Sequence, residues 1–281
     1  GHGMAGRYLD AGFTVMLWNR SKTKAEDLIA RGAQWATSPE DAAIDADAVV
    51  TMVADDEASR AVWLGPKGAA KTAKAGTIAI ECSTVSYDHA REMGRELNAR
   101  GLIYIDCPVT GLPDAAAAGK LTLLVGADAA DLERARPFLE PIGSTIRHFG
   151  AVGSGTVYKL INNLMGAIQI AGLAEGLAIA EQAGLDMNLV LESIQAGVAA
   201  SPQVQRHSKR MVARDFSGAT FTAALRHKDA AYAVKLAESL LADKPLVSRA
   251  AVEAYAQAKA AMPDDDEGRM IELVSRPRKP S

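Results

Sequence analysis

The 281-residue sequence has two cysteines, 5% aromatic residues and a formal net charge of only −3. Cys82 and Cys107 form neither a CxxC pair nor a zinc-ligand spacing, which predicts reduced thiols in a cytoplasmic protein rather than a disulfide scaffold. The near-neutral charge argues against a nucleic-acid partner. No uninterrupted apolar run reaches the roughly 18 residues of a membrane helix, so no membrane partner is expected.

Alanine is abundant, which favours a helix-rich chain. Up to about residue 150, short apolar segments with β-branched residues alternate with amphipathic ones. The expected strands are Phe13–Trp18, Ala48–Val53, Thr77–Ile80, Leu102–Ile105 and Leu121–Val125, and the expected helices are Lys22–Arg31, Pro39–Ile44, Tyr87–Arg100 and Ala129–Leu139. This alternation predicts a mostly parallel, doubly wound sheet.

The strand signal ends near Gly150, and one long apolar helix is expected from Thr156 to Ala183. The further expected helices are Met187–Ala196, Gln203–Ala213, Thr222–Ala242 and Pro245–Ala261. The sequence therefore predicts an α/β domain over residues 1–151 and an all-α domain over residues 152–281, which begins with the long interdomain helix.

The chain opens on a glycine-rich segment, Gly1-His2-Gly3-Met4-Ala5-Gly6. In dinucleotide-binding folds of the Rossmann type, glycines at this spacing make a tight turn, let the backbone approach a pyrophosphate and allow close helix packing. The helix N-terminus also offers free N–H groups to the anion. Such a fold needs a first strand of about 5–6 residues before Gly1, so we expect the native protein to have a strand that this sequence does not include.

The residues after the strand Phe13–Trp18 bear on cofactor choice. NAD sites usually place an acidic residue there, whereas an arginine suits the 2′-phosphate of NADP. The sequence reads Asn19-Arg20-Ser21 with Lys24 nearby, and no acidic residue precedes Glu26. This favours NADP, with NAD possible; a solvated basic helix start is the alternative interpretation.

Lys159 and Asn163 are spaced i and i+4 in the long apolar helix, so they share one face. Burial in a cleft would lower the pKa of the lysine toward neutrality, as a general acid/base requires. A lysine that extends its amine to solvent from a helix start is the alternative. The Gly/Pro-containing loop from Asp106 to Ala115 offers backbone N–H groups and the Thr110 hydroxyl to a carboxylate, or is a plain connection.

Other polar residues receive less specific interpretations. None of the five histidines has a serine or cysteine partner at a suggestive spacing. The pair Lys228-Asp229 alone indicates an exposed ion pair on an amphipathic helix. The acidic run Asp264–Glu267 lacks the alternating ligand spacing of a calcium loop and predicts a solvated helix cap, so no metal site is expected.

Five segments, taken in order, resemble the β-hydroxyacid dehydrogenases, the group that contains 3-hydroxyisobutyrate dehydrogenase and tartronate semialdehyde reductase and is related to 6-phosphogluconate dehydrogenase. They are the glycine loop, Glu81-Cys82-Ser83-Thr84, the loop Asp106–Gly111, the helix with Gly153, Lys159 and Asn163, and the helix with Phe221, Lys228 and Asp229. The resemblance implies a dinucleotide-binding domain, a helical domain for substrate and oligomerisation, and hydride transfer between nicotinamide C4 and the carbonyl carbon of a small hydroxyacid or semialdehyde.

The resemblance also implies residue roles. Lys159 is the expected acid/base, Asn163 helps to fix the substrate, Thr110, Gly111 and Leu112 bind it, and Lys228 lies beside substrate and cofactor. The expected cofactor-binding residues are Gly1, His2, Gly3, Met4, Ala5, Gly6, Asn19, Arg20, Ser21, Lys24, Val53, Ala54, Asp55, Thr84 and Lys228.

The substrate loop departs from the family pattern, which mostly has Ser-Gly-Gly where this chain has Thr110-Gly111-Leu112-Pro113. Leu112 adds bulk and Pro113 has no N–H, so the loop is expected either to bind a carboxylate less well or to suit a more apolar substrate. The departure keeps an imine reductase or reductive aminase as an alternative, although Lys159 argues against it. A non-catalytic NADP-binding protein is a third hypothesis. The apolar helices predict a homodimer or homotetramer formed through the C-terminal half.

Overall fold

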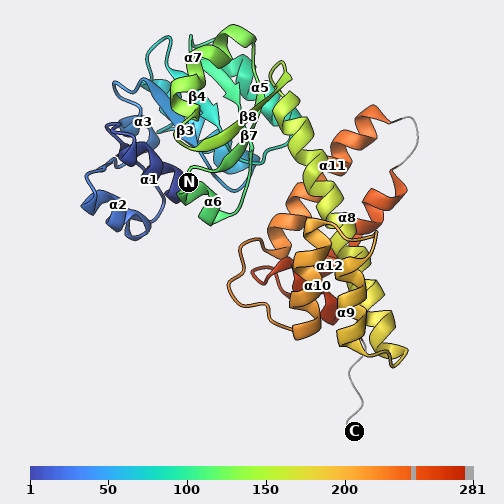
Figure 1. Ribbon diagram of the computed structural model, residues 1–281. Helices are drawn as coiled ribbons and strands as arrows, with labels where there is room; N and C mark the ends of the chain where they lie inside the picture. The colour runs from blue at the N-terminus through green and yellow to red at the C-terminus, as the bar shows by residue number, and fades with distance from the viewer. Residues whose placement is uncertain (242–244, 276–281) are drawn as a thin grey trace. The chain divides into compact units, whose positions relative to one another are not determined.

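The computed structural model describes residues 1–241 and 245–275, and the chain folds into two compact units (Figure 1). The first unit is Gly1–Lys159 and the second is Leu160–Ser281. The predicted helical domain and the predicted helix Thr222–Ala242 extend in part into positions 242–244 and 276–281, which lie outside the described residues.

The first unit is an α/β unit. Its strands are β1 (Met16–Leu17), β2 (Gln34–Trp35), β3 (Ala48–Thr51), β4 (Ile78–Glu81), β5 (Ile103–Asp106), β6 (Val109–Thr110), β7 (Leu121–Gly126) and β8 (Gly143–Gly150). Its helices are α1 (His2–Asp10), α2 (Glu26–Ala30), α3 (Pro39–Ala42), α4 (Asp56–Leu64), α5 (Tyr87–Asn98), α6 (Pro113–Ala117) and α7 (Ala129–Leu139), with 3₁₀ turns η1 (Lys22–Ala25) and η2 (Ala69–Lys71).

The main sheet has the strand order β3-β4-β5-β7-β6, with β8 also paired to β7, and β1 and β2 form a separate parallel pair. The pairings β3–β4, β4–β5 and β7–β8 are parallel, whereas β7 runs antiparallel to β5 and β6. Three neighbouring strands thus point their carboxyl ends to one edge of the sheet.

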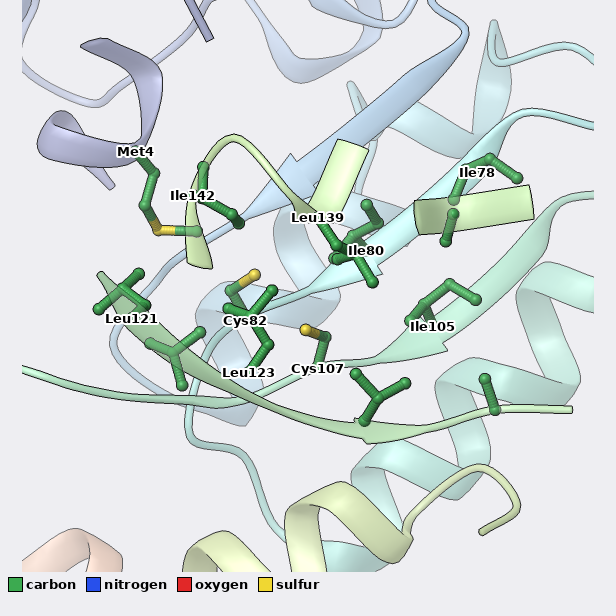
Figure 2. Close-up of a cluster of buried hydrophobic side chains, with 14 of the residues drawn as sticks. Met4, Ile78, Ile80, Cys82, Ile105, Cys107, Leu121, Leu123, Leu139 and Ile142 are labelled. Atoms are coloured by element: carbon green, nitrogen blue, oxygen red, sulfur yellow. The ribbon is translucent and has the colours of Figure 1, made fainter. Parts of the chain in front are cut away.

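Helices cover both faces of this sheet. Successive residues of a strand point to opposite faces, so they pack against different helices. Ile78 and Ile80 pack with Met4 of α1 and Leu139 of α7, as Figure 2 shows. Ala79, one residue away from each, belongs to a different cluster with residues of α4 and α5. Strands β4, β5 and β7 are buried at nearly every position, whereas β3 is half-buried. All four are continuous apolar segments, which is why the sequence predicts them well.

The second unit is helical. Helix α8 (Ser154–Gln182) starts in the first unit and continues into the second, where it is followed by α9 (Met187–Ala196), α10 (Pro202–Ala213), α11 (Ala223–Leu240), α12 (Leu246–Ala261), η3 (Glu267–Met270) and α13 (Ile271–Val274). Within the described residues, α8 alone has the length and hydropathy to cross a membrane. Half of its most apolar window is buried inside the protein.

The predicted fold class, an α/β domain followed by a helical one, is confirmed. The details differ where local pattern and tertiary contacts disagree. The expected strand Phe13–Trp18 shortens to β1, and the expected helix Lys22–Arg31 splits into η1 and α2. Helix α4, whose N-terminus is capped by the Asp55 side chain, was not expected, since its charged first turn hides the apolar residues behind it.

Candidate active site

The three parallel strands β3, β4 and β5 end level with one another. Thr51 of β3 is paired with Glu81 of β4, and Glu81 with Asp106 of β5. In doubly wound folds, ligands bind outside the carboxyl ends of such strands. Four predicted site residues lie in the loops that follow β3 and β4, whereas Thr110 ends the short strand β6 and Gly111 follows it; the four are Val53, Ala54, Asp55 and Thr84.

The glycine loop forms the start of α1, with Gly1 as its N-cap. Among the described residues no side chain caps this end, so the first N–H groups of the helix are available to an anion. Gly3 also has a packing role, because a Cβ there would lie 2.7 Å from the backbone N of Ala117 in α6. Met4 is buried in the core, so only its backbone can face a ligand. These residues fit a bound pyrophosphate.

The basic segment after β1 is open to solvent. Asn19, Arg20 and Lys24 are exposed, and Asn19 Nδ2 donates a hydrogen bond to the carbonyl of Ser21 at 2.9 Å. His2 contacts α2, with its Nε2 2.9 Å from Asp27 Oδ1. The side chains of Arg20 and Lys24, which the sequence predicts as cofactor-binding, are thus exposed to solvent.

Glu81, the last residue of β4, is completely buried, and its hydrogen bonds connect the segments around it. Its carboxylate accepts hydrogen bonds from Ser59 Oγ at 2.6 Å, Trp63 Nε1 at 3.1 Å and the backbone N–H of Ser83 at 3.0 Å. The Ser83 hydroxyl in turn accepts from Val53 N at 2.7 Å. Through this chain of contacts Glu81 fixes the loops after β3 and β4, a role that the sequence does not reveal.

His89 is part of the same network through a serine thirty residues away, a distance at which no sequence spacing indicates a partner. Its Nε2 lies 3.0 Å from Ser59 Oγ. Because Ser59 donates its proton to Glu81, it accepts one from His89, which sets the Nε2–H tautomer. Burial lowers the pKa of His89 and outweighs the nearby Asp56 and Glu81, which raise it, so the neutral ring is favoured. Ser59 is fully buried, which suits a structural link rather than a nucleophile.

Asp55, a predicted cofactor-binding residue, caps α4 with its side chain. Its Oδ1 accepts the backbone N–H of Ala58 at 2.8 Å and caps α4. One carboxylate oxygen is thus committed to the helix. The backbone of the segment from Val53 to Asp55 remains available to a ligand at the carboxyl edge of the sheet.

Lys159 is half-buried near the start of α8, and its Nζ donates to the backbone carbonyl of Val109 at 2.7 Å. Val109 immediately precedes Thr110 and Gly111, so the amine is tied to the predicted substrate loop. Gly111 has φ of 132°, which a residue with a side chain adopts only with strain. Leu112 is 43% exposed, so its side chain is open to a ligand.

Asp106, the last residue of β5, caps the start of α8. Its Oδ2 accepts the N–H groups of Gly153 at 3.0 Å and Thr156 at 2.9 Å, and its Oδ1 accepts the Thr156 hydroxyl at 2.6 Å. Burial raises the pKa of Asp106 to about 6, although these three donors favour the carboxylate. The sequence alone places Asp106 only at the start of a loop.

Asn163 is buried in the second unit, where its Nδ2 donates to Asp229 Oδ2 at 2.6 Å. Asp229 Oδ1 lies 3.0 Å from Lys228 Nζ on α11. The expectation of an exposed ion pair is wrong: Asp229 is buried, and the Lys228 side chain is 19% exposed. The three predicted residues Asn163, Lys228 and Asp229 therefore form one connected polar group.

The acidic run contains the predicted cap, since Asp266 caps η3 by accepting the N–H of Gly268 at 3.0 Å, but Asp266 and Glu267 are buried rather than solvated. Asp266 contacts Arg210 at 3.1 Å, and Glu267 forms a buried ion pair with Arg226. His207 Nε2 lies 3.4 Å from Glu267 Oε1. Burial opposes ionisation, but the contacts with His207 and Arg226 hold the pKa of Glu267 below its usual range.

Arg226 connects this ion pair to the predicted site. Its Nη1 donates to the backbone carbonyl of Asn163 at 2.9 Å, and its guanidinium lies 4.5 Å from the ring centre of Phe221. Glu267 thus supports Asn163 through Arg226. Among the described residues, no group of three or more His, Cys, Asp and Glu side chains is arranged to hold a metal ion.

Comparison with known proteins agrees with this arrangement. Residues 1–150 match the family model for the NAD binding domain of 6-phosphogluconate dehydrogenase, and residues 153–274 match the model described as NAD-binding of NADP-dependent 3-hydroxyisobutyrate dehydrogenase. Glyoxylate/succinic semialdehyde reductase 2 of Arabidopsis thaliana is 31% identical over 98% of this chain and 76% of its own length. The NAD-dependent L-serine dehydrogenase of Pseudomonas aeruginosa is 33% identical over 88% of this chain and 85% of its own.

Solved structures give the same result. The 3-hydroxyisobutyrate dehydrogenase of Mycobacterium tuberculosis, solved with L-serine, is 29% identical and has a TM-score of 0.87, covering 98% of this chain and 95% of that one. An imine reductase of Streptomyces aurantiacus, 22% identical with a TM-score of 0.61, shares the fold. The chain therefore belongs to the β-hydroxyacid dehydrogenase family, the NAD(P)-dependent dehydrogenases and reductases that act on CH–OH groups.

Proposed function

We propose that the protein interconverts a small hydroxyacid and its semialdehyde or keto form, with Lys159 as acid/base and NADP as the preferred cofactor. The observation that carries this proposal is the position of the Lys159 amine, 2.7 Å from the Val109 carbonyl and adjacent to the Thr110–Gly111 loop at the carboxyl edge of the sheet. Relatives named for succinic semialdehyde, L-serine and 2-(hydroxymethyl)glutarate support the substrate class.

The first unit, with a proposed dinucleotide-binding domain over residues 1–151, would hold the cofactor. The free N–H groups of Gly1, His2 and Gly3 would bind the pyrophosphate, and the loops around Val53 and Thr84 would line the nicotinamide side. When bound, the nicotinamide supplies or accepts a hydride at C4. Ala5, Gly6 and Ser21 complete the proposed cofactor contacts.

The protein's own groups manage the proton and the substrate carboxylate. In reduction, the Lys159 ammonium would donate a proton to the carbonyl oxygen as it gains negative charge, and in oxidation the neutral amine would remove the hydroxyl proton. The N–H of Gly111 and the hydroxyl of Thr110 would bind the carboxylate, with Leu112 against the carbon chain. Asn163 and Lys228, from the proposed domain 152–281, would orient the substrate.

Cofactor preference follows from Arg20, whose planar fork can bind the 2′-phosphate of NADP in two hydrogen bonds. We expect Arg20→Ala to raise the Kd for NADPH about 10- to 100-fold, because a charge-assisted contact of about 1.5–3 kcal/mol is lost. The Kd for NADH should change little. Fluorescence titration measures both, and Arg134→Ala on α7, an exposed arginine in an ion pair with Asp131, is the matched control. Equal losses for the two cofactors would contradict the preference.

An assay panel tests the substrate class. Initial rates with NADPH and NADH are measured for C3–C5 hydroxyacids, semialdehydes and cyclic imines. We expect turnover with one or more hydroxyacid or semialdehyde pairs and none with imines. Activity confined to imines would favour the imine reductase alternative, which the Leu112-Pro113 departure supports. Binding of NADPH without any turnover would favour a non-catalytic protein.

We also propose a homodimer or homotetramer formed through the second unit. Its surface carries several large apolar side chains that are more than half exposed, including Ile179, Leu189, Leu240 and Leu246. Exposed apolar side chains are typical of an interface where they form one contiguous patch. Light scattering at micromolar concentration should give at least twice the chain mass of 29.5 kDa, and a monomer would contradict the proposal.

The free, buried thiols of Cys82 and Cys107 agree with a proposed cytoplasmic location.

A further inference from the structure

We propose that Asp106 and Thr156 are positioning residues that hold the Lys159 amine at the substrate loop. This inference rests on the proposed function, since it assigns a role relative to the acid/base lysine. It concerns residues of the first unit, and the Asp106 carboxylate makes its hydrogen bonds to Gly153 and Thr156.

The two residues form a buried clamp between β5 and α8. Asp106 is 0% exposed and Thr156 is 1% exposed. The carboxylate accepts three hydrogen bonds from the first turn of α8, two from backbone N–H groups and one from the Thr156 hydroxyl. An acidic group at this end also interacts favourably with the helix dipole, and 29-residue α8 has no acidic residue of its own in the first turn.

A second contact closes a ring with the clamp. Val109 lies three residues after Asp106, and Lys159 lies three residues after Thr156 on the same helix. The Thr156 hydroxyl joins Asp106 at one end, and the Lys159 amine joins the Val109 carbonyl at the other, at 2.6 Å and 2.7 Å. The amine therefore has little freedom to shift along α8 or away from the loop while both contacts hold.

The clamp is built for geometry and not for packing alone. A hydrophobic residue pair could fill the same space without the cost of burying a charge. The Thr156 hydroxyl orients the carboxylate so that its other oxygen faces the two N–H groups. Loss of this hydroxyl would let the carboxylate rotate and the first turn of α8 loosen. A shift of about 1 Å in a reacting group can lower a rate about 10²-fold.

The test compares Thr156→Val, which keeps the side-chain shape and removes the donor, with Thr156→Ser, which keeps the donor. We expect Thr156→Val to lower kcat about 10- to 100-fold with an unchanged Kd for NADPH, and Thr156→Ser to restore most of the loss. The control is Thr77→Val, another buried threonine, whose hydroxyl donates to the Ala46 carbonyl at 3.1 Å. It should lower the melting temperature comparably and leave kcat unchanged.

Rates are expressed per NADPH-binding site from fluorescence titration, so unfolded protein does not contribute. Wild-type kcat in Thr156→Val would overturn the inference, and so would an equal loss of kcat in Thr156→Val and Thr156→Ser. Lys159→Met, measured in parallel, separates the two levels. If that variant retains wild-type kcat, the proposed function fails; if it is inactive while Thr156→Val is unaffected, only the positioning role fails.

Discussion

Replacing Lys159 with methionine is expected to lower kcat about 10²- to 10⁴-fold, the contribution typical of a general acid or base. Methionine keeps much of the length and apolar stem of lysine but can neither donate nor accept the proton. The hydrogen bond to the Val109 carbonyl is also lost. The Kd for NADPH should stay close to that of the wild type, because the glycine loop and Arg20 are untouched.

The matched control is Lys71→Met. Lys71 is exposed, and its amine also donates to a backbone carbonyl, that of Pro66, away from the carboxyl edge. Its replacement should change neither kcat nor cofactor binding. Stopped-flow measurement of NADPH oxidation with the best substrate of the panel gives the rate of the chemical step. A Lys159→Met enzyme with wild-type rates would contradict the acid/base role.

The second large effect is expected in the second unit, where Glu267→Ala should lower the free energy of unfolding by about 3–5 kcal/mol. The change leaves Arg226, which is 4% exposed, as a buried cation without its carboxylate partner. Because Arg226 also donates to the Asn163 carbonyl, the segment around Asn163 should loosen with it. Urea denaturation followed by circular dichroism measures the loss.

Two further variants show whether the buried pair is the cause. Glu272→Ala removes an exposed partner of Arg269 and should cost at most about 1 kcal/mol. The double variant Arg226→Met with Glu267→Leu removes both charges and should recover much of the stability lost in Glu267→Ala. Equal effects of Glu267→Ala and Glu272→Ala would mean that the pair contributes no more than a surface contact.

Much of the fold can be predicted from the sequence, because its signals are local. Buried strands such as β4 are continuous apolar segments, and α7 and α9 have the predicted bounds. Strand β8 escaped prediction, because it lies at the edge of the sheet and is half-exposed, with Arg147 and His148 in its sequence. The short strand β6 is defined by its pairing with β7, which no local pattern encodes.

The site likewise contains residues that the sequence reveals and residues that only the folded structure reveals. Lys159, Asn163 and the glycine loop are recognisable because each has a spacing within a few residues. The supporting groups are different: Asp106 meets Thr156 fifty residues away, and Arg226 meets Glu267 forty-one residues away. In the sequence Asp106 ends an apolar strand and Glu267 lies in an acidic run. A carboxylate that directly ends a buried strand was the available signal for Asp106.

The central claim, that this chain carries out nicotinamide-dependent redox chemistry on a small hydroxyacid or semialdehyde, is tested most directly by isotope transfer. The protein is incubated with NADPH deuterated at C4, in each stereochemical position in turn, together with the best aldehyde or keto substrate, and the product is analysed by mass spectrometry. We expect a hydroxyacid product that carries one deuterium from one of the two labelled cofactors. Tight binding of NADPH with no deuterated product across the panel would contradict it.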